Sequence, residues 1–160
     1  MLQHLLSDQW SVRRAFPRAA MRAIRDRIGE QEKRHSAELR FAVEASLPLA
    51  HLWRGQDARR RAVELFGQLG VWDTEHNSGV LIYLLLADKR VEIVADRGIH
   101  NRVGDAAWEA ICAEMQRAFA AGRFEQGVCF GVVAISDLLA AHFPPGGGPR
   151  NELPNEPVVL

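Results

Sequence analysis

Two polar segments carry most of the residues that suit cation binding. Residues 73–79 read Asp-Thr-Glu-His-Asn-Ser-Gly, and residues 96–105 contain aspartate, histidine and arginine side chains. Carboxylate, hydroxyl and amide oxygens are the ligands that Ca²⁺ and Mg²⁺ prefer, whereas imidazole suits only metals that accept nitrogen. We therefore predict a site for Ca²⁺ or Mg²⁺ between these segments, with the ligands Asp96, Glu75, Thr74, Asn77 and His100.

The second segment also predicts an anion subsite beside that cation. Asp105 is expected to be the N-cap of a helix, and helix N-termini attract anions. Arg97 and Arg102 have two interpretations, which both stay open: they hold a phosphate next to the cation, or they neutralise the nearby acids without any metal.

The standard catalytic signatures are absent from the sequence. There is no G-x-x-x-x-G-K-[ST] phosphate loop, no H-E-x-x-H and no G-x-S-x-G. No nucleophile is identified, so a hydrolase would need a metal-activated water. Two classes of function remain: a non-enzymatic interaction module, which the missing nucleophile favours, and a weak divalent-cation-dependent phosphatase.

Hydrophobic periodicity predicts the elements that position these segments. Residues 88–89 are expected to form a two-residue hairpin turn, and Asp105 to start a helix whose face includes Trp108 and Met115. The predicted elements are a helix over 16–34, a half-buried strand over 38–45, a helix over 58–69, strands over 80–87 and 90–95, a helix from 105 to about 121, and a helix over 125–142, which should be the most buried one.

This order predicts an α/β fold, a three-layer α/β/α sandwich with a small mixed sheet. The first two strands are joined by a helical crossover and should be parallel, and the hairpin adds an antiparallel third strand. The hairpin also brings the segments 73–79 and 96–105 to one end of the sheet. We divide the chain into a basic helix over 1–35, the α/β domain over 36–143, and a linker with an extended tail over 144–160.

Composition limits the partners. The net charge is zero, which argues against nucleic-acid binding, although arginines concentrate in the first forty residues. That basic segment is either a solvated helix face or a docking surface for anionic lipid or an acidic protein. The apolar runs are too short or interrupted for a transmembrane segment, no secretory signal is visible, and both cysteines are expected to be reduced. These features predict a cytoplasmic protein, with peripheral membrane contact as an alternative.

Two further expectations concern apolar residues outside the regular pattern. Trp53, Trp72 and Trp108 are expected to pack in the core or at its rim rather than to form a binding platform. The tail carries Leu153 and Val158, so it either docks on the domain or on a second copy, or it is disordered.

The stretch from about Ser36 to Leu139 resembles the TPM domain family. The resemblance rests on the ordered segments 65–71, 79–83 and 91–99, on Phe119-x-x-Gly122 followed by Gly127, and on the tail sequence Asn-Glu-Leu-Pro at 151–154. It implies a short bacterial member without signal peptide or membrane anchor and a three-layer α/β/α fold. It also implies links to photosystem repair, to receptor modulation and to acid phosphatase activity, with divalent cation binding in some members. The resulting hypothesis is a TPM-like interaction module that assists a membrane protein or its maintenance.

Overall fold

The chain begins with two helices separated by a proline. A computed structural model describes residues 2–146 and 152–160, and it places α1 over Leu2–Ala15, α2 over Arg18–Gln31 and a 3₁₀ turn, η1, over Glu32–Arg34. The prediction of one helix over 16–34 was therefore wrong at its start. Pro17 is extended, with φ −59° and ψ 164°, because proline restrains its own φ and ends the preceding helix.

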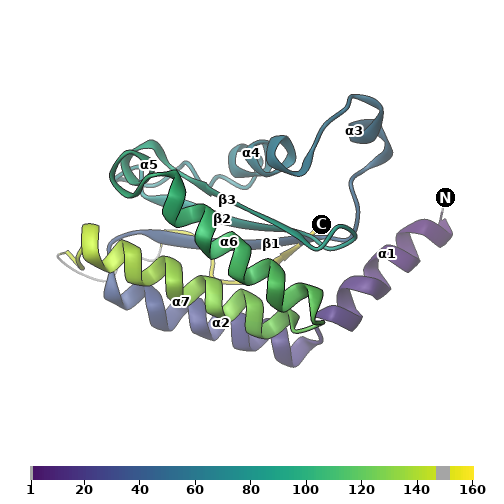
Figure 1. Ribbon diagram of the computed structural model, residues 1–160, viewed down its shortest axis with the longest axis horizontal. Coiled ribbons are helices and arrows are strands. Elements are labelled where there is room, and N and C mark those ends of the chain that lie inside the picture. The colour runs from purple at the N-terminus through teal and green to yellow at the C-terminus, as the bar shows by residue number, and fades with distance from the viewer. Residues whose placement is uncertain (1, 147–151) are drawn as a thin grey trace.

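A four-stranded mixed sheet forms the middle layer. Its strands are β1 (Glu38–Glu44), β2 (Gly79–Leu85), β3 (Arg90–Ala95) and β4 (Val158–Val159), in the order β3-β2-β1-β4 (Figure 1). β1 is parallel to β2 and to β4, and β2 is antiparallel to β3. The predicted crossover and hairpin are confirmed.

The hairpin turn is longer than predicted. It spans residues 86–89, because Leu85 pairs with Arg90, whereas a two-residue turn at 88–89 would pair Ala87 with Arg90. The amides of Leu86 and Ala87 donate instead to the carbonyls of Glu44 and Ala45, at 2.9 Å each. Lys89 closes the turn with a positive φ of 50°.

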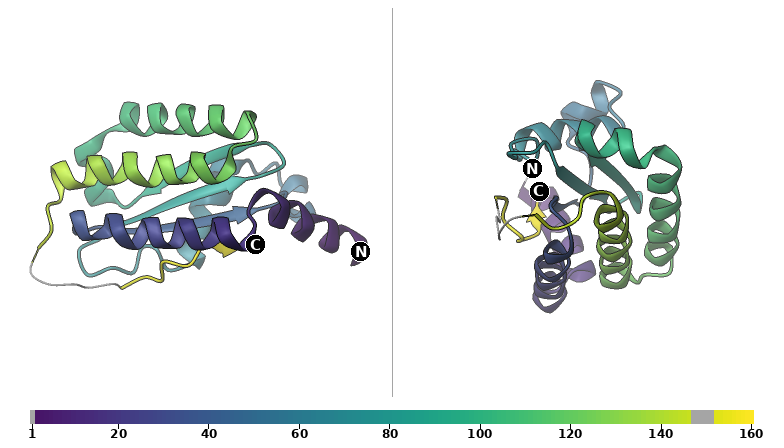
Figure 2. Two further views of the ribbon diagram at one scale, coloured as in Figure 1. Left: turned by 90° about the horizontal axis from the view of Figure 1, so that it is seen from below. Right: turned by 90° about the vertical axis from the view of Figure 1, so that its left-hand side faces the viewer.

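One face of the sheet is covered by helices α2, α6 (Asp105–Ala120) and α7 (Phe124–His142) (Figure 2). The alternate residues Leu39, Phe41 and Val43 of β1 point into this layer, as the alternating pattern predicts. The predicted helix faces are confirmed: the core includes Trp108, Ile111, Met115, Phe119, Val128, Val132, Ile135 and Leu139, with Cys112 partly buried against it.

The opposite face is covered by α4 (Ala58–Gln68) and by the C-terminal tail. Leu65 of α4 packs with Leu81 and Tyr83 of β2, and Leu153 of the tail joins the same cluster. This third layer buries the polar side of β1 as well, so all seven residues of β1 are buried and the prediction of a half-buried strand was wrong. The three-layer α/β/α architecture is confirmed.

Helix α5 (Arg97–Val103) occupies a segment for which the sequence predicted no helix. The Asp96 side chain accepts a hydrogen bond from the Arg97 amide at the start of α5. The N-cap of α6 is Gly104, whose φ is 80°, and Asp105 is the first helical residue. The prediction that Asp105 is the N-cap was therefore wrong by one residue.

Helix α7 is long and apolar. Among the described helices, α7 is the one whose length and composition would suit a membrane span. Of its most apolar 18-residue stretch, 39% is buried inside the protein. It packs against α2 and α6, and Gly127 and Gly131 allow Phe119 and Met115 to approach closely. Its outer face is exposed at Phe130, but it has seven buried residues against four in each of α2, α4 and α6, which confirms the expectation that this helix is the most buried of them.

The tail docks on its own domain. Val158 and Val159 pair with Ala42 and Val43 of β1, and the Leu160 amide donates to Val43 at 2.9 Å. Leu153 is only 8% exposed. This confirms the docked interpretation of the tail against the disordered one for residues 152–160, whereas linker residues 147–151 lie outside the described part of the chain.

Candidate cation-binding site

The two predicted segments adjoin at one end of the sheet. The Asp96 amide donates to the Gly79 carbonyl at 2.9 Å, and a Cβ atom added to Gly98 would lie 3.4 Å from the Asn77 carbonyl oxygen. Hairpin geometry therefore predicted the position of the two backbone segments correctly. The side chains of the predicted ligands, however, make separate local contacts.

Most predicted ligands on these segments have local partners. Thr74 Oγ1 accepts from the Ser78 amide at 2.9 Å, and Asp96 accepts from the Arg97 amide at 2.7 Å. His100 Nε2 lies 3.3 Å from Asp105 Oδ1, and both side chains are well exposed. These contacts stabilise a turn and two helix starts.

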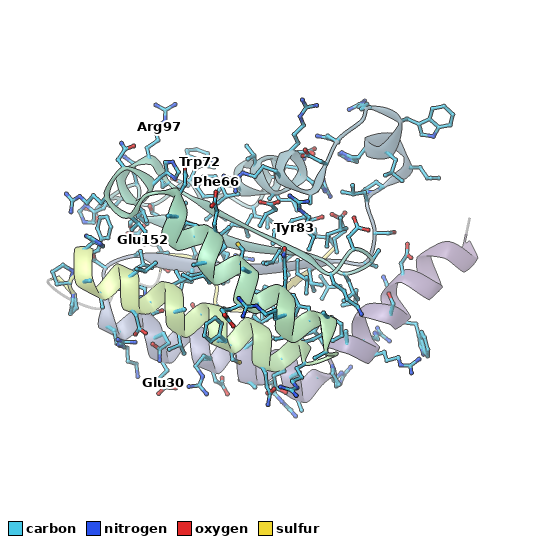
Figure 3. All side chains as sticks on the ribbon, in the orientation of Figure 1. Glu30, Phe66, Trp72, Tyr83, Arg97 and Glu152 are labelled. Carbon is cyan, nitrogen blue, oxygen red and sulfur yellow. The ribbon has the colours of Figure 1, made fainter. Side chains whose placement is uncertain are left out.

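The predicted anion-binding arginines do not converge. Arg97 points away from the body of the molecule (Figure 3). Arg102 Nη1 instead reaches the carbonyl oxygen of His142 at 3.4 Å, and its guanidinium lies 4.9 Å from the centroid of the Phe143 ring. The two side chains therefore provide no shared phosphate cradle in this structure.

Glu75 belongs to a different feature, which we call the acidic pocket. This is an open cavity of about 1450 Å³ between the end of α2, η1, the start of β1, the loop before β2 and the tail. The Glu75 amide donates to Glu152 Oε2 at 3.0 Å, which joins the loop to the tail. Figure 3 shows Glu152 and Tyr83 toward opposite ends of the sheet, so the acidic pocket lies where β1 begins.

Carboxylates dominate the lining of the acidic pocket. Arg25 and Lys33 also line it, and the nearby His35 is neutral, because burial lowers its pKa to about 4. Excess negative charge in a partly enclosed space attracts cations. The lining carboxylates are Asp26, Glu30, Glu32, Glu38, Glu75, Glu152 and Glu156.

Glu38 is the central acid of the acidic pocket. It is the first residue of β1 and is 5% exposed. Its Oε1 accepts from the Glu152 amide at 2.8 Å, whereas its buried Oε2 has no hydrogen-bond partner among the described residues. Burial raises the pKa of Glu38, and hydrogen bonds from the backbone of Glu152 and Leu153 oppose this rise only in part. A buried carboxylate oxygen without a donor is destabilising, and a cation or a proton would relieve it.

Two further oxygen-bearing side chains lie near Glu38, and one of them, Glu32, is mostly protonated at neutral pH. Glu32 accepts from the Leu39 amide at 2.8 Å, and burial raises its pKa to about 8, with the charge of Glu38 adding to the effect. Asn155 Oδ1, on the tail, is buried and unpaired within the described residues. The acidic pocket thus contains hydrogen-bond acceptors that a cation or a hydrogen-bond donor would satisfy.

Sequence reasoning missed Glu32, Glu38 and Asn155. Glu38 was assigned to the polar side of a half-buried strand, and its burial depends on a tail that joins the strand from 114 residues away. The sequence feature that could have indicated this site is the tail sequence Asn-Glu-Leu-Pro. The backbone amide of its glutamate, Glu152, donates the hydrogen bond that Glu38 accepts.

The donors in the acidic pocket suit a hard cation, but they do not form a finished coordination set. Over residues 2–146 and 152–160, no group of three histidine, cysteine or carboxylate side chains stands ready to hold a metal. Cys112 and Cys129 are free thiols, and burial raises the pKa of Cys112 to about 11, so it is not a thiolate nucleophile.

A second buried polar cluster lies at the other end of the sheet. Arg61 donates two hydrogen bonds of 2.9 Å to the Glu44 carboxylate, and the Tyr83 hydroxyl donates to Glu44 Oε2 at 2.7 Å. Glu64 also lies 3.3 Å from Arg61. Charge and hydrogen bonding are satisfied within this cluster, which identifies it as structural.

Comparison with known proteins assigns the chain to a family. Residues 13–138 match the TPM domain. The chain belongs to the TPM domain family.

Solved structures support this assignment. The NMR structure of BA42 protein from the psychrophilic bacterium Bizionia argentinensis is 31% identical, with a TM-score of 0.80, and covers 91% of this chain and 95% of its own. The N-terminal domain of a P. gingivalis protein shares the fold at 19% identity and a TM-score of 0.66, over 83% of each chain. A comparison with curated proteins gave no match.

Proposed function

We propose that this chain is a non-enzymatic interaction module that binds a divalent cation, Ca²⁺ or Mg²⁺, in the acidic pocket. The observation that carries this proposal is the buried Glu38 carboxylate, whose Oε2 has no partner among the described residues. Of the ligands predicted from sequence, the proposal retains Glu75, which lines the same cavity.

The cation would keep part of its water shell. Mg²⁺ commonly does so and is often held by one or two carboxylates, so a ready set of three protein ligands is not required. Glu38 belongs to the sheet, whereas Glu152 and Asn155 belong to the tail. A cation shared between them would tie the tail to the domain and present that surface to a partner protein.

The phosphatase alternative has less support. The lining of carboxylates would repel a phosphomonoester, and the arginines expected to bind phosphate lie apart. An assay of p-nitrophenyl phosphate hydrolysis with and without metal separates the two functions, and the proposal expects no turnover. Metal-dependent turnover that Glu38→Gln abolishes would establish the hydrolase instead.

Isothermal titration with Ca²⁺ and Mg²⁺ tests the cation site. We expect wild type to bind with a dissociation constant on the order of 10⁻⁴–10⁻³ M, the range of weak modules. Glu38→Gln should weaken binding by roughly tenfold or more, because it removes a charge and an oxygen ligand. Glu109→Gln, an exposed acid on α6, is the matched control and should leave the affinity unchanged.

The variant Asp96→Asn tests whether the cation binds in the acidic pocket or at the segment 96–105. The proposal expects binding unchanged in this variant, because Asp96 starts α5. Binding lost with Asp96→Asn but retained with Glu38→Gln would move the cation to the segment 96–105. Absence of binding in wild type at millimolar metal would contradict the proposal itself.

A further inference from the structure

Helix α3 (Leu49–Trp53) projects from the end of the sheet opposite the acidic pocket (Figure 1). Its apolar side chains face solvent: Leu49 is 74% exposed, Leu52 54% and Trp53 86%. The expectation that Trp53 packs in the core or at its rim was therefore wrong. A cluster of large exposed apolar side chains marks an interaction surface more often than a chance feature. We call these three side chains the apolar tip.

The apolar tip is held in place by the polar side of the same helix. The His51 ring contacts Gln56 and lies 3.5 Å from Glu64 of α4, and the Gln56 amide donates to the His51 carbonyl at 3.0 Å. These contacts anchor α3 to the start of α4. The apolar side chains consequently point away from the domain.

Exposed arginines follow the apolar tip in the sequence. Arg54 follows it directly, and Arg60 lies on the first turn of α4. Asp57 is the one acid in this stretch, and its side chain accepts from the Arg60 amide. The neighbourhood of the tip is therefore basic as well as apolar.

Helix α1 leaves the molecule at the same end as α3 (Figures 1 and 2), and Ser46 Oγ, just before α3, lies 3.4 Å from Asp8 Oδ2 of α1. Trp10 follows Asp8 by two residues, which is more than half a turn of the helix. The exposed Trp10 ring and the Arg14 guanidinium, 5.3 Å from its centroid, therefore lie on the side of α1 away from α3 and do not belong to the apolar tip.

We propose that the apolar tip, with the arginines that flank it, docks on an anionic lipid surface. Tryptophan and leucine favour the membrane interface, and arginines near it are attracted to anionic headgroups. A stable protein interface buries about 800 Å² on each partner, more than a convex five-residue helix offers. A lipid surface deforms around such a tip and needs no matching groove. This inference is independent of the proposed cation site.

Co-sedimentation with lipid vesicles tests this inference. The full chain is mixed with phosphatidylcholine vesicles that contain roughly 30% phosphatidylglycerol, and separately with pure phosphatidylcholine vesicles. We expect binding to the anionic vesicles, weakened by added salt, and much less binding to the neutral ones. Trp53→Ser and Leu52→Ser should each reduce the bound fraction about fivefold, because an interfacial anchor is lost.

Trp72→Ser is the matched control. Trp72 is 55% exposed but lies before β2, at the other end of the sheet, and its Nε1 donates to the Gly67 carbonyl. This variant should bind anionic vesicles like wild type. Circular dichroism verifies that each variant remains folded, so a loss of binding can be assigned to the surface.

Three results would overturn the inference. One is no binding of wild type to anionic vesicles at low salt. Another is binding that Trp53→Ser and Leu52→Ser leave unchanged. The third is a dimer in light scattering that Trp53→Ser dissociates, which would assign the apolar tip to a second copy of the chain.

Discussion

Glu32, which is partly buried, and His35, which is buried, lie three residues apart in the lining of the acidic pocket, and burial favours the uncharged form of each. Burial raises the pKa of Glu32 to about 8 and lowers that of His35 to about 4. The His35 ring has partners that suit a neutral imidazole, since Nδ1 accepts from the Ala37 amide and Nε2 lies 3.2 Å from Ser136 Oγ. The two residues therefore give stability opposite dependences on pH.

Glu32 should lower the free energy of unfolding as pH rises from about 4.5 to about 8, and the net decline should appear above about pH 6.5, where His35 no longer opposes it. The ordinary pKa of Glu32 is 4.5, so across the window from about 4.5 to about 8 the folded state holds a proton that the unfolded chain has released. Glu32→Gln should flatten this decline in urea denaturation. Glu109→Gln should keep it. An equal slope in wild type and Glu32→Gln would show that Glu32 titrates normally.

His35 acts between about pH 4 and 6.5, where it opposes the effect of Glu32. Its folded pKa is depressed below 6.5, so its contribution is present above 6.5 and is lost as pH falls through about 4. Because Glu32→Gln leaves His35 intact, the acid side of the stability curve should survive in that variant. The two residues can thus be separated in one pH series.

The buried ion pair between Arg61 and Glu44 should be sensitive to removal of one partner. Arg61→Met leaves the Glu44 carboxylate buried with only the Tyr83 hydroxyl and should cost about 3–5 kcal/mol. The double variant Arg61→Met, Glu44→Gln should be less destabilised than Arg61→Met alone, measured by chemical denaturation. A loss below about 1 kcal/mol for the single variant would show that the pair is solvated.

At the scale of elements, the contact between α6 and α7 depends on small residues. A Cβ atom at Gly127 would lie 2.6 Å from Phe119 Cε1 and 3.1 Å from Ala118 Cβ. The Phe119 ring is fully buried and stacked on Phe124, so it has little freedom to move. The helices can approach this closely only while position 127 has no side chain.

Gly127→Ala should therefore destabilise the fold by about 1–3 kcal/mol, the usual range for overpacking. Gly67→Ala, within α4, is the matched control, because no atom lies within 4 Å of its added Cβ. That variant should be neutral or stabilising by up to about 1 kcal/mol, since alanine favours helix more than glycine does. Equal effects of the two substitutions in thermal unfolding would contradict the close packing.

Strands and long helices were predictable because their signals are local. The alternation at 90–95 and the apolar run at 80–85 mark β3 and most of β2, and the spacing of Trp108, Ile111 and Met115 marks α6. α5 was missed because it is only seven residues long and follows a turn-like sequence. The split between α1 and α2 was missed although Pro17 signals it.

At the scale of the whole molecule, the acidic pocket could not be predicted from local patterns. Glu38 and Glu152 meet only because the tail crosses the domain to pair with β1. The same crossing buries the polar side of β1 and leaves Glu38 Oε2 without a partner in the described part of the chain. The two loops at that end were placed correctly by hairpin geometry, but their side-chain partners depend on turns and caps that only the fold reveals.

The central claim is that a divalent cation binds in the acidic pocket, between the sheet and the tail. A ¹H–¹⁵N NMR titration with Ca²⁺ and Mg²⁺ up to roughly 10 mM tests it residue by residue. The account predicts chemical shift changes centred on residues 36–39, 74–78 and 152–156, which Glu38→Gln removes. Shift changes centred on residues 96–105, or none at all, would contradict it.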